Sequence, residues 1–336
     1  MKSFLDKYDT VIFDMDGVIT GEQNYWNSAA LTVWEYLNWN IGIDINSAEC
    51  MKRMSEIRSR VFCNDELISV LKGRGVNSNW DLGYVTVLIS WIVHGKDKIG
   101  DFTDVLEYAE TLPENILDAY DMLARKASEK TGFDYDWLRR NELMWKTMHM
   151  IFQGWFLGDE LAAAQNMPPM RPGKPGLVYA EKPIIEQEVL VTLLSELSRT
   201  KRVCMGTGRP SAEIMEPLKR WNVIKYFDAD GLCNYDHVAE AEKETGLTLT
   251  KPHPYMFLKA LYSTDYDDKR IINGNYDRNK ILKTLVVGDA GADMLAAQAM
   301  GADFCAVLTG VSGQAAKKYF EEHNADYILN SAADML

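Results

Sequence analysis

The sequence predicts an α/β protein: a parallel sheet with helices on both faces, interrupted by a large α-helical insertion. The first observation is a short apolar run at 10–13, typical of a buried parallel strand, which ends in Asp14, Asp16 and Gly17. The second is an alternation of strands, loops and helices that begins at about residue 184. The third is that helical spacing prevails between these regions, with almost no alternating strand pattern.

Length and charge limit the organisation and the partners. A chain of 336 residues is long for one core, so we expect a core domain from 1–20 and 184–336 and a helical cap domain from 21–183. The apolar fraction of 47% is ordinary for a globular protein. A net charge of -13 argues against nucleic acid or a membrane as a general partner. A phosphate-bearing substrate would therefore need local positive charge or a cation.

The lack of an apolar signal core and the scattered cysteines favour a cytoplasmic protein. The first seven residues hold no apolar signal core, and the apolar run 85–93 is too short to cross a bilayer. Five cysteines are scattered without metal-ligand spacing, which indicates reduced core thiols. They are Cys50, Cys63, Cys204, Cys233 and Cys305.

The end of the first strand carries candidate catalytic groups. Ligands bind at the carboxyl ends of strands in open α/β sheets. Asp14 and Asp16 would share a face of a continuing strand, and Gly17 lets the backbone turn away tightly. This arrangement suits a nucleophile with an acid/base partner.

The insertion is predicted to be helical and rich in aromatic residues. Helices are expected at 25–39, 48–62, 81–93, 114–130 and 134–156. Eight of the nine tryptophans fall in this region, which favours a bulky helical core. An alternative is that some of them line the substrate. They are Trp26, Trp34, Trp39, Trp80, Trp91, Trp137, Trp145 and Trp155.

A linker rich in proline and glycine is predicted to end the insertion. Residues 167–176 contain four prolines and two glycines, which cannot continue a helix. Arg171 and Lys174 would reach a substrate phosphate if the linker folded over the site, but a solvated linker is the simpler interpretation.

The next strand is predicted to end in a phosphate-binding loop. A helical stripe at 185–197 precedes the strand 202–205, which runs into a glycine-flanked threonine. The Thr207 hydroxyl and exposed backbone N–H groups, including that of Gly208, are suited to phosphate oxygens. The alternative is a plain turn before a helix. Arg209 is a further candidate phosphate contact.

Two further motifs complete the candidate site. Lys251, fixed by a flanking proline, would stabilise charge on a nucleophile and on a transferring phosphoryl group, whereas His253 is interpreted as structural. A buried strand at 285–288 leads into Asp289 and Asp293, which supply the oxygen ligands that Mg²⁺ prefers. For Asp293, helix capping is an alternative.

Together these motifs resemble the four signatures of haloacid dehalogenase (HAD) superfamily phosphatases, in the same order. Asp14-x-Asp16-Gly17 resembles the first and Thr207 the second, and residues 251–257 are similar to the third in phosphoglycolate-phosphatase-like members. Gly288-Asp289-x-x-x-Asp293 resembles the fourth. The likeness covers about 8–20 and 184–336. It implies a Rossmann-like core with an enlarged type 1 cap.

The sequence differs from the usual family pattern at several positions. Gly21 stands where the family often has an acidic residue, and Ala290 and Ala292 replace residues that are often polar. Because the insertion is larger than the usual cap, the family's substrate contacts cannot be carried over.

The resemblance implies an Mg²⁺-dependent phosphatase acting on a small phosphorylated metabolite, such as a sugar phosphate or nucleotide. Asp14 would be the nucleophile and Asp16 the acid/base group. Asp14, Asp289 and the Asp16 backbone carbonyl would hold the metal, with Asp293 in support. Thr207, Gly208 and Lys251 would position the phosphate, and the cap would exclude bulk water. A phosphomutase of the β-phosphoglucomutase type and a non-catalytic binding module remain alternatives.

Overall fold

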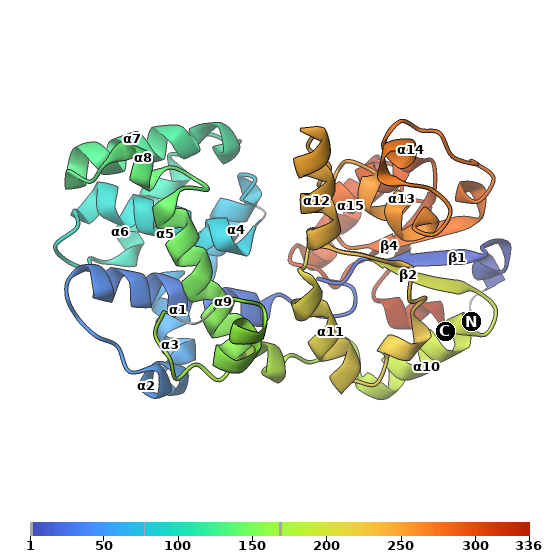
Figure 1. Cartoon of the computed structure of the whole chain (residues 1–336), viewed down its shortest axis with the longest axis horizontal. Helices are drawn as coiled ribbons and strands as arrows, with labels where there is room; N and C mark the ends of the chain where they lie inside the picture. The colour runs from blue at the N-terminus through green and yellow to red at the C-terminus, as the bar shows by residue number, and fades with distance from the viewer. Residues whose placement is uncertain (1–2, 77, 168–169) are drawn as a thin grey trace. The chain divides into compact units, whose positions relative to one another are not determined.

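The computed structural model describes residues 3–76, 78–167 and 170–336, so the Pro168–Pro169 part of the predicted linker lies outside the described residues. The chain divides into two compact units. One is an α/β unit that combines the residues up to Glu22 with Glu181–Leu336, and the other is a helical unit over Gln23–Ala180 (Figure 1). The predicted α/β class, with a parallel sheet and an added helical region, is confirmed.

Within the described residues, six parallel strands form one sheet in the order β3-β2-β1-β4-β5-β6. The strands are β1 (Thr10–Phe13), β2 (Arg202–Gly206), β3 (Leu232–Cys233), β4 (Thr284–Gly288), β5 (Asp303–Val307) and β6 (Tyr327–Leu329). The chain builds outward from β1 in one direction, then returns to the other side of β1 with β4. This reversal is a topological switch point, where open α/β sheets bind ligands. Phe13 pairs with both Met205 and Val287, so three strands end side by side.

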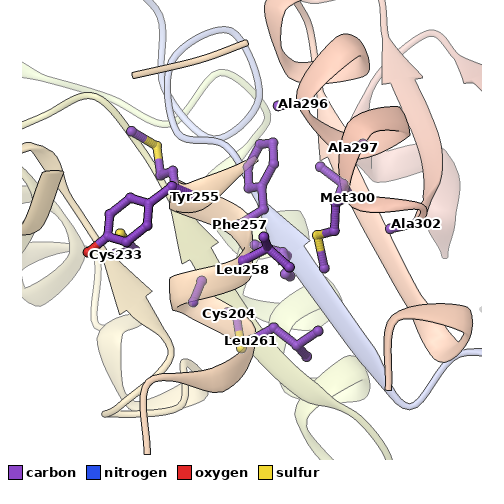
Figure 2. Close-up of a cluster of buried hydrophobic side chains, with 14 of the residues drawn as sticks. Cys204, Cys233, Tyr255, Phe257, Leu258, Leu261, Ala296, Ala297, Met300 and Ala302 are labelled. Atoms are coloured by element: carbon purple, nitrogen blue, oxygen red, sulfur yellow. The ribbon is translucent and has the colours of Figure 1, made fainter. Parts of the chain in front are cut away.

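Helices cover both faces of the sheet. Side chains alternate along each strand, so both faces carry apolar residues that the helices bury. The helices are α10 (Gln187–Ser198), α11 (Ser211–Arg220), α12 (Tyr235–Thr245), α13 (Tyr255–Tyr262), α14 (Asp268–Ile272), α15 (Gly291–Met300) and α16 (Ala316–Glu322). Ile12 faces α13 and α15, and the core around Phe257 on that side is drawn in Figure 2. Val11 and Phe13 face α10, which lies on the opposite side of the sheet (Figure 1). Trp221, which follows α11, is buried in this second layer.

The helical unit is built around two central helices, α1 (Gln23–Asn40) and α5 (Asn79–His94). Its other helices are α2 (Ser47–Lys52), α3 (Met54–Val61), α4 (Glu66–Gly73), α6 (Phe102–Glu110), α7 (Tyr120–Thr131), α8 (Tyr135–Leu138) and α9 (Leu143–Ala164). Helix α1 packs against α3, α5 and α9, and α5 also packs against α6 and α7. Trp91 and Trp155 are fully buried, as expected of core aromatics, whereas Trp39 is 40% exposed. No helix among the described residues has both the length and the apolar character needed to cross a membrane.

Several predicted helices of this unit are wrong in extent. The helix expected over 48–62 is interrupted at Arg53, whose ψ of 13° leaves the helical range. The helix expected over 114–130 begins only at Tyr120, after a 3₁₀ turn, although Gly132 ends it in a left-handed conformation at φ 74°. The helix expected over 134–156 is divided by the extended Arg139. Helices α4 and α6 were not predicted, because their apolar stripes are short.

The solvated-linker interpretation is wrong at Lys174. Its side chain is buried in the helical unit, where Nζ lies 2.9 Å from Oε2 of Glu35 and 5.0 Å from the ring centre of Trp155. Arg171 pairs with Asp44. Both cations of the linker therefore have carboxylate partners within the helical unit.

Candidate active site

Three carboxylates meet at the edge of the α/β sheet where β1 and β4 end. The Asp14 N–H donates to the Val287 carbonyl at 2.8 Å, which continues the ladder and fixes Asp14 one residue beyond β1. Asp289 follows β4, and Asp293 lies in the first turn of α15. The carboxylate oxygens of Asp14, Asp289 and Asp293 lie within 4.8 Å of one another. Asp14 and Asp293 are buried and Asp289 is half-buried.

Two glycines let the backbone approach Asp289. Gly17 adopts φ +73°, and a Cβ built on it would lie 2.2 Å from Oδ2 of Asp289. A Cβ on Gly310 would lie 1.8 Å from the same oxygen. Gly17 was predicted as a turn residue, whereas Gly310 was not predicted, because its contact is with a strand end that is distant in the sequence.

Lys251 connects two of the carboxylates. Its Nζ lies 2.7 Å from Oδ1 of Asp14 and 2.7 Å from Oδ1 of Asp293. Burial alone would lower the pKa of Lys251, but the two carboxylates raise it well above its ordinary value, so the side chain stays charged. Asp293 also accepts from the Ala290 N–H at 3.3 Å, so it caps α15 and contacts Lys251 at once.

The charges of this cluster fit a divalent cation. Burial raises the pKa of Asp14 to about 7, although Lys251 opposes this shift. Burial, followed by the charges of Asp293 and Asp14, also raises the pKa of Asp289. Three carboxylates thus face one ammonium, and this surplus of negative charge on oxygen ligands suits Mg²⁺. Asp14, Asp289 and Asp293 would hold the ion.

The structure places the Asp16 carboxylate elsewhere. Among the described residues, the group of mutually close carboxylates contains Asp14, Asp289 and Asp293 but not Asp16. The Asp16 side chain instead accepts hydrogen bonds from Arg209. Asp16 was predicted to contribute only its backbone carbonyl to the metal, and its carboxylate lies outside this group.

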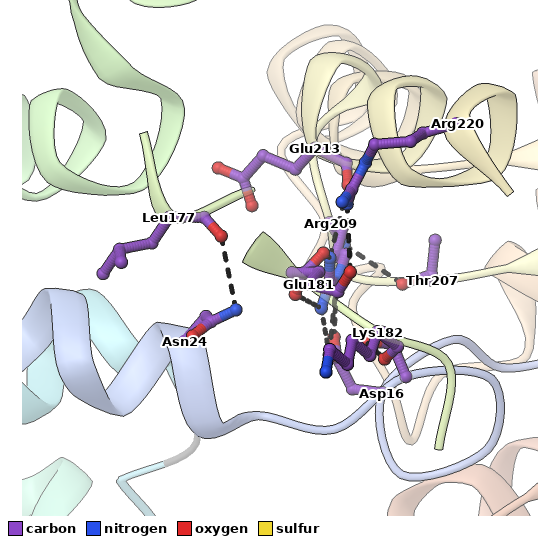
Figure 3. Close-up of polar contacts among 10 residues, drawn as sticks. Asp16, Asn24, Leu177, Glu181, Lys182, Thr207, Arg209, Glu213 and Arg220 are labelled. Atoms are coloured by element: carbon purple, nitrogen blue, oxygen red, sulfur yellow. Dashed lines mark hydrogen bonds and ion pairs between the residues drawn. The ribbon is translucent and has the colours of Figure 1, made fainter. Parts of the chain in front are cut away.

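The loop after β2 differs in part from its prediction. Thr207 is buried, and its N–H donates to the Cys233 carbonyl at 3.0 Å, so this amide belongs to the sheet and is not one of the exposed N–H groups of the loop. Its Oγ1 accepts from the Arg209 N–H at 3.2 Å. Gly208 is exposed. The structure pairs Arg209, the candidate phosphate contact, with Asp16 and with Glu181, a residue that sequence reasoning missed (Figure 3).

A separate hollow of about 450 Å³ lies beside β3 and is lined by Ser211, His237 and Lys259 among others. Its lysine pairs with Asp268 at 2.6 Å. None of the four candidate carboxylates lines this hollow, so it is separate from the carboxylate cluster.

Known proteins resemble this chain in the C-terminal part of its sequence and in its fold. Residues 248–335, which include Lys251, Asp289 and Asp293, match a family model described as HAD-hydrolase-like. An X-ray structure from the Northeast Structural Genomics Consortium is 25% identical over 97% of both chains, with a TM-score of 0.82. No curated protein sequence matches the chain.

Two named structures are more distant. A HAD-superfamily hydrolase of subfamily IA, variant 1, from Geobacter sulfurreducens is 16% identical over 98% of this chain and 95% of its own, with a TM-score of 0.42. A phosphatase from Thermococcus thioreducens is 16% identical over 96% of this chain and 91% of its own, with a TM-score of 0.48.

Proposed function

We propose that this chain, which matches a HAD-hydrolase-like family model over residues 248–335, is an Mg²⁺-dependent phosphatase that cleaves a small phosphomonoester through an aspartyl-phosphate on Asp14. The observation that carries the proposal is the cluster of Asp14, Asp289 and Asp293 around Lys251. Three carboxylates and one ammonium leave a negative surplus that a divalent cation completes.

The proposed reaction has two displacements at phosphorus. A carboxylate oxygen of Asp14 attacks the phosphorus, the bond to the ester oxygen breaks, and Asp16 gives its proton to the departing alcohol. Asp16 then takes a proton from water as the water attacks the same phosphorus. The bond to Asp14 breaks, inorganic phosphate leaves, and both aspartates return to their starting state. When bound, Mg²⁺ would offset the negative charge of the phosphate.

The remaining site residues hold the phosphate. Lys251, beside the Asp14 oxygen, offsets charge that builds up on the phosphoryl group. The Thr207 hydroxyl and the exposed Gly208 follow the neighbouring strand and would bind the other phosphate oxygens. A sugar phosphate, a nucleotide or a similar metabolite is the proposed substrate class.

We also propose a cytoplasmic location. Burial raises the pKa of Cys204, Cys233 and Cys305 to about 12, so these thiols are unreactive members of the core. Free, buried cysteines are typical of proteins that work in a reducing compartment.

The test is phosphate release from a panel of phosphorylated metabolites, with Mg²⁺ and with a chelator. The native protein is compared with Asp14→Asn and with Asp9→Asn, a matched control just before the same strand whose side chain is 68% exposed. We expect release that needs Mg²⁺, is lost in Asp14→Asn and is kept in Asp9→Asn. Release that survives in Asp14→Asn would contradict the proposed nucleophile. Isomerised sugar phosphate as the product would favour the mutase alternative.

A further inference from the structure

We propose that Arg209 is a positioning residue for the acid/base group Asp16, and that Glu181 holds Arg209 in the orientation that this role requires. The inference rests on the proposed function, because it assigns these two residues a role in the proton transfers of that reaction.

The Arg209 guanidinium lies between two carboxylates (Figure 3). Toward Asp16, Nη2 donates to Oδ1 at 2.7 Å, and Nε lies 3.2 Å from Oδ1 and 3.1 Å from Oδ2. Toward Glu181, Nη1 donates to Oε2 at 2.8 Å and Nη2 donates to Oε1 at 2.9 Å. The planar guanidinium thus holds both carboxylates through paired hydrogen bonds, which fix orientation as well as distance.

Burial distinguishes the two carboxylates. The side chains of Arg209 and Glu181 are each 1% exposed, whereas that of Asp16 is 26% exposed. Arg209 and Glu181 therefore form the fixed part of the group, and Asp16 is the member with room to move.

Backbone contacts hold the fixed part in place. The Arg209 N–H donates to Oγ1 of Thr207 at 3.2 Å, and Nη1 also donates to the Glu213 carbonyl at 3.3 Å. The Glu181 carbonyl accepts from Arg220 at 3.0 Å. Arg209 is thus tied to the predicted phosphate-binding residue at one end and to Asp16 at the other.

The second carboxylate explains how Arg209 can hold Asp16 in one direction. A contact with Asp16 alone would leave the guanidinium free to follow that partly exposed side chain, whereas the paired contacts with the buried Glu181 fix the plane of the guanidinium. Asp16 is therefore oriented by a donor that is itself held in place.

The experiment compares two esters that differ in their need for a proton. p-Nitrophenolate leaves readily without protonation, whereas phenolate depends on it more. The readout is the ratio of kcat/KM for phenyl phosphate to that for p-nitrophenyl phosphate, because kcat/KM reports the step that expels the alcohol. General acid catalysis contributes about 10²–10⁴-fold, so we expect this ratio to fall roughly tenfold or more in Arg209→Gln and in Glu181→Gln. A purely structural role would lower both rates equally and leave the ratio unchanged.

A double-mutant cycle with Asp16→Asn sharpens the test. If Arg209 acts through Asp16, the ratio falls in Asp16→Asn and Arg209→Gln adds little further loss to it, because groups that act as a unit are not additive. Independent, additive losses would overturn the proposal. Should Arg209→Gln fail to fold, the double variant Arg209→Gln/Glu181→Gln removes both buried charges together, and its ratio is expected to fall in the same way.

Arg202→Gln is the matched control. It is the same substitution at the start of β2, the strand that precedes Arg209, and it breaks an ion pair with Asp228 at 3.0 Å. We expect its ratio to equal that of the native protein. A native protein that cleaves neither ester nor any metabolite would reject the proposed function, and this inference with it. Cleavage that needs Asp14, with an unchanged ratio in every Arg209 and Glu181 variant, would reject this inference alone.

Discussion

Two lysines with little exposed side chain, one in each unit, have similar surroundings and a different balance of charge. Lys174 pairs with Glu35 at 2.9 Å and lies 5.0 Å from the centre of the Trp155 ring. Lys251 pairs with Asp14 and Asp293 at 2.7 Å each, and lies 4.7 Å from the centre of the Phe257 ring.

The difference lies in the number of carboxylates. Lys174 and Glu35 neutralise each other, so the pair is complete and has a structural role. Lys251 faces a cluster that contains Asp289 as well as its two partners, and negative charge remains. A buried cation is therefore informative about function only when the opposing charges around it are counted.

The largest effect on stability is expected at the balanced pair. Lys174→Met leaves the Glu35 carboxylate buried, with 1% of its side chain exposed, and without its cation. We expect the free energy of unfolding to fall by about 3–5 kcal/mol. Chemical denaturation measures this loss, and the double variant Lys174→Met/Glu35→Gln should recover much of it. An equal loss in the double variant would mean that packing of the lysine stem, not charge, stabilises this site.

The corresponding change at the unbalanced cluster should affect catalysis more than folding. Lys251→Met removes a donor beside the nucleophile, and loss of one such group costs about 2.7–4 kcal/mol of transition-state stabilisation, or 10²–10³ in rate. Steady-state kinetics with the best substrate measures it. The folded double variant at Lys174 and Glu35 serves as the control and should keep native kinetics.

Mg²⁺ should bind at the unbalanced cluster and raise the free energy of unfolding. At a concentration about 100 times its dissociation constant, Mg²⁺ should stabilise the protein by about 2.7 kcal/mol. Thermal unfolding with and without Mg²⁺ measures this shift, and Asp289→Asn should remove most of it. Asp9→Asn, outside the cluster, should retain it. If Asp289→Asn kept the full shift, the ion would be bound elsewhere.

A further expected effect is a pH dependence that is confined to the unbalanced cluster and spread over several pH units. The Asp14 pKa is about 7 in the folded chain and 3.8 ordinarily, so between these values the native state holds more protons than the unfolded state. The contribution of Asp14 to metal-free stability is therefore complete below about pH 4 and is lost as the pH rises toward 7. Mg²⁺ must displace this proton, so its affinity should rise with pH below 7, by up to about tenfold per unit.

Calorimetry in two buffers of different ionisation enthalpy measures the displaced proton at pH 6. Asp14→Asn should abolish the release, whereas Glu35→Gln should leave it unchanged. Equal heats in both buffers would show that Asp14 is already ionised in the metal-free protein.

The sequence predicted those parts of the site that depend on local patterns. Asp14 and Asp289 each follow an apolar strand, and the ends of neighbouring parallel strands necessarily meet at one edge. Glu181 and Gly310 were missed, because their partners Arg209 and Asp289 are brought to them only by the folded chain.

Predictions from composition and periodicity were wrong where tertiary contacts override local preference. The proline- and glycine-rich segment suggested a solvated linker, but Lys174 within it is buried against Glu35. Helical periodicity continued through Arg53 and Arg139, although the chain leaves the helix at both positions. Periodicity identifies the face that a helix buries, but it does not reveal where packing requires the helix to stop.

The uneven distribution of tryptophan makes the two units optically distinct. Eight indoles lie in the helical unit, and Trp221 represents the α/β unit. In a Trp221→Phe chain, tryptophan fluorescence excited selectively would originate from the helical unit alone, while far-ultraviolet circular dichroism would still follow both units. Coincident unfolding curves from the two signals would mean that the units unfold as one cooperative block, and separated curves would give each unit its own stability.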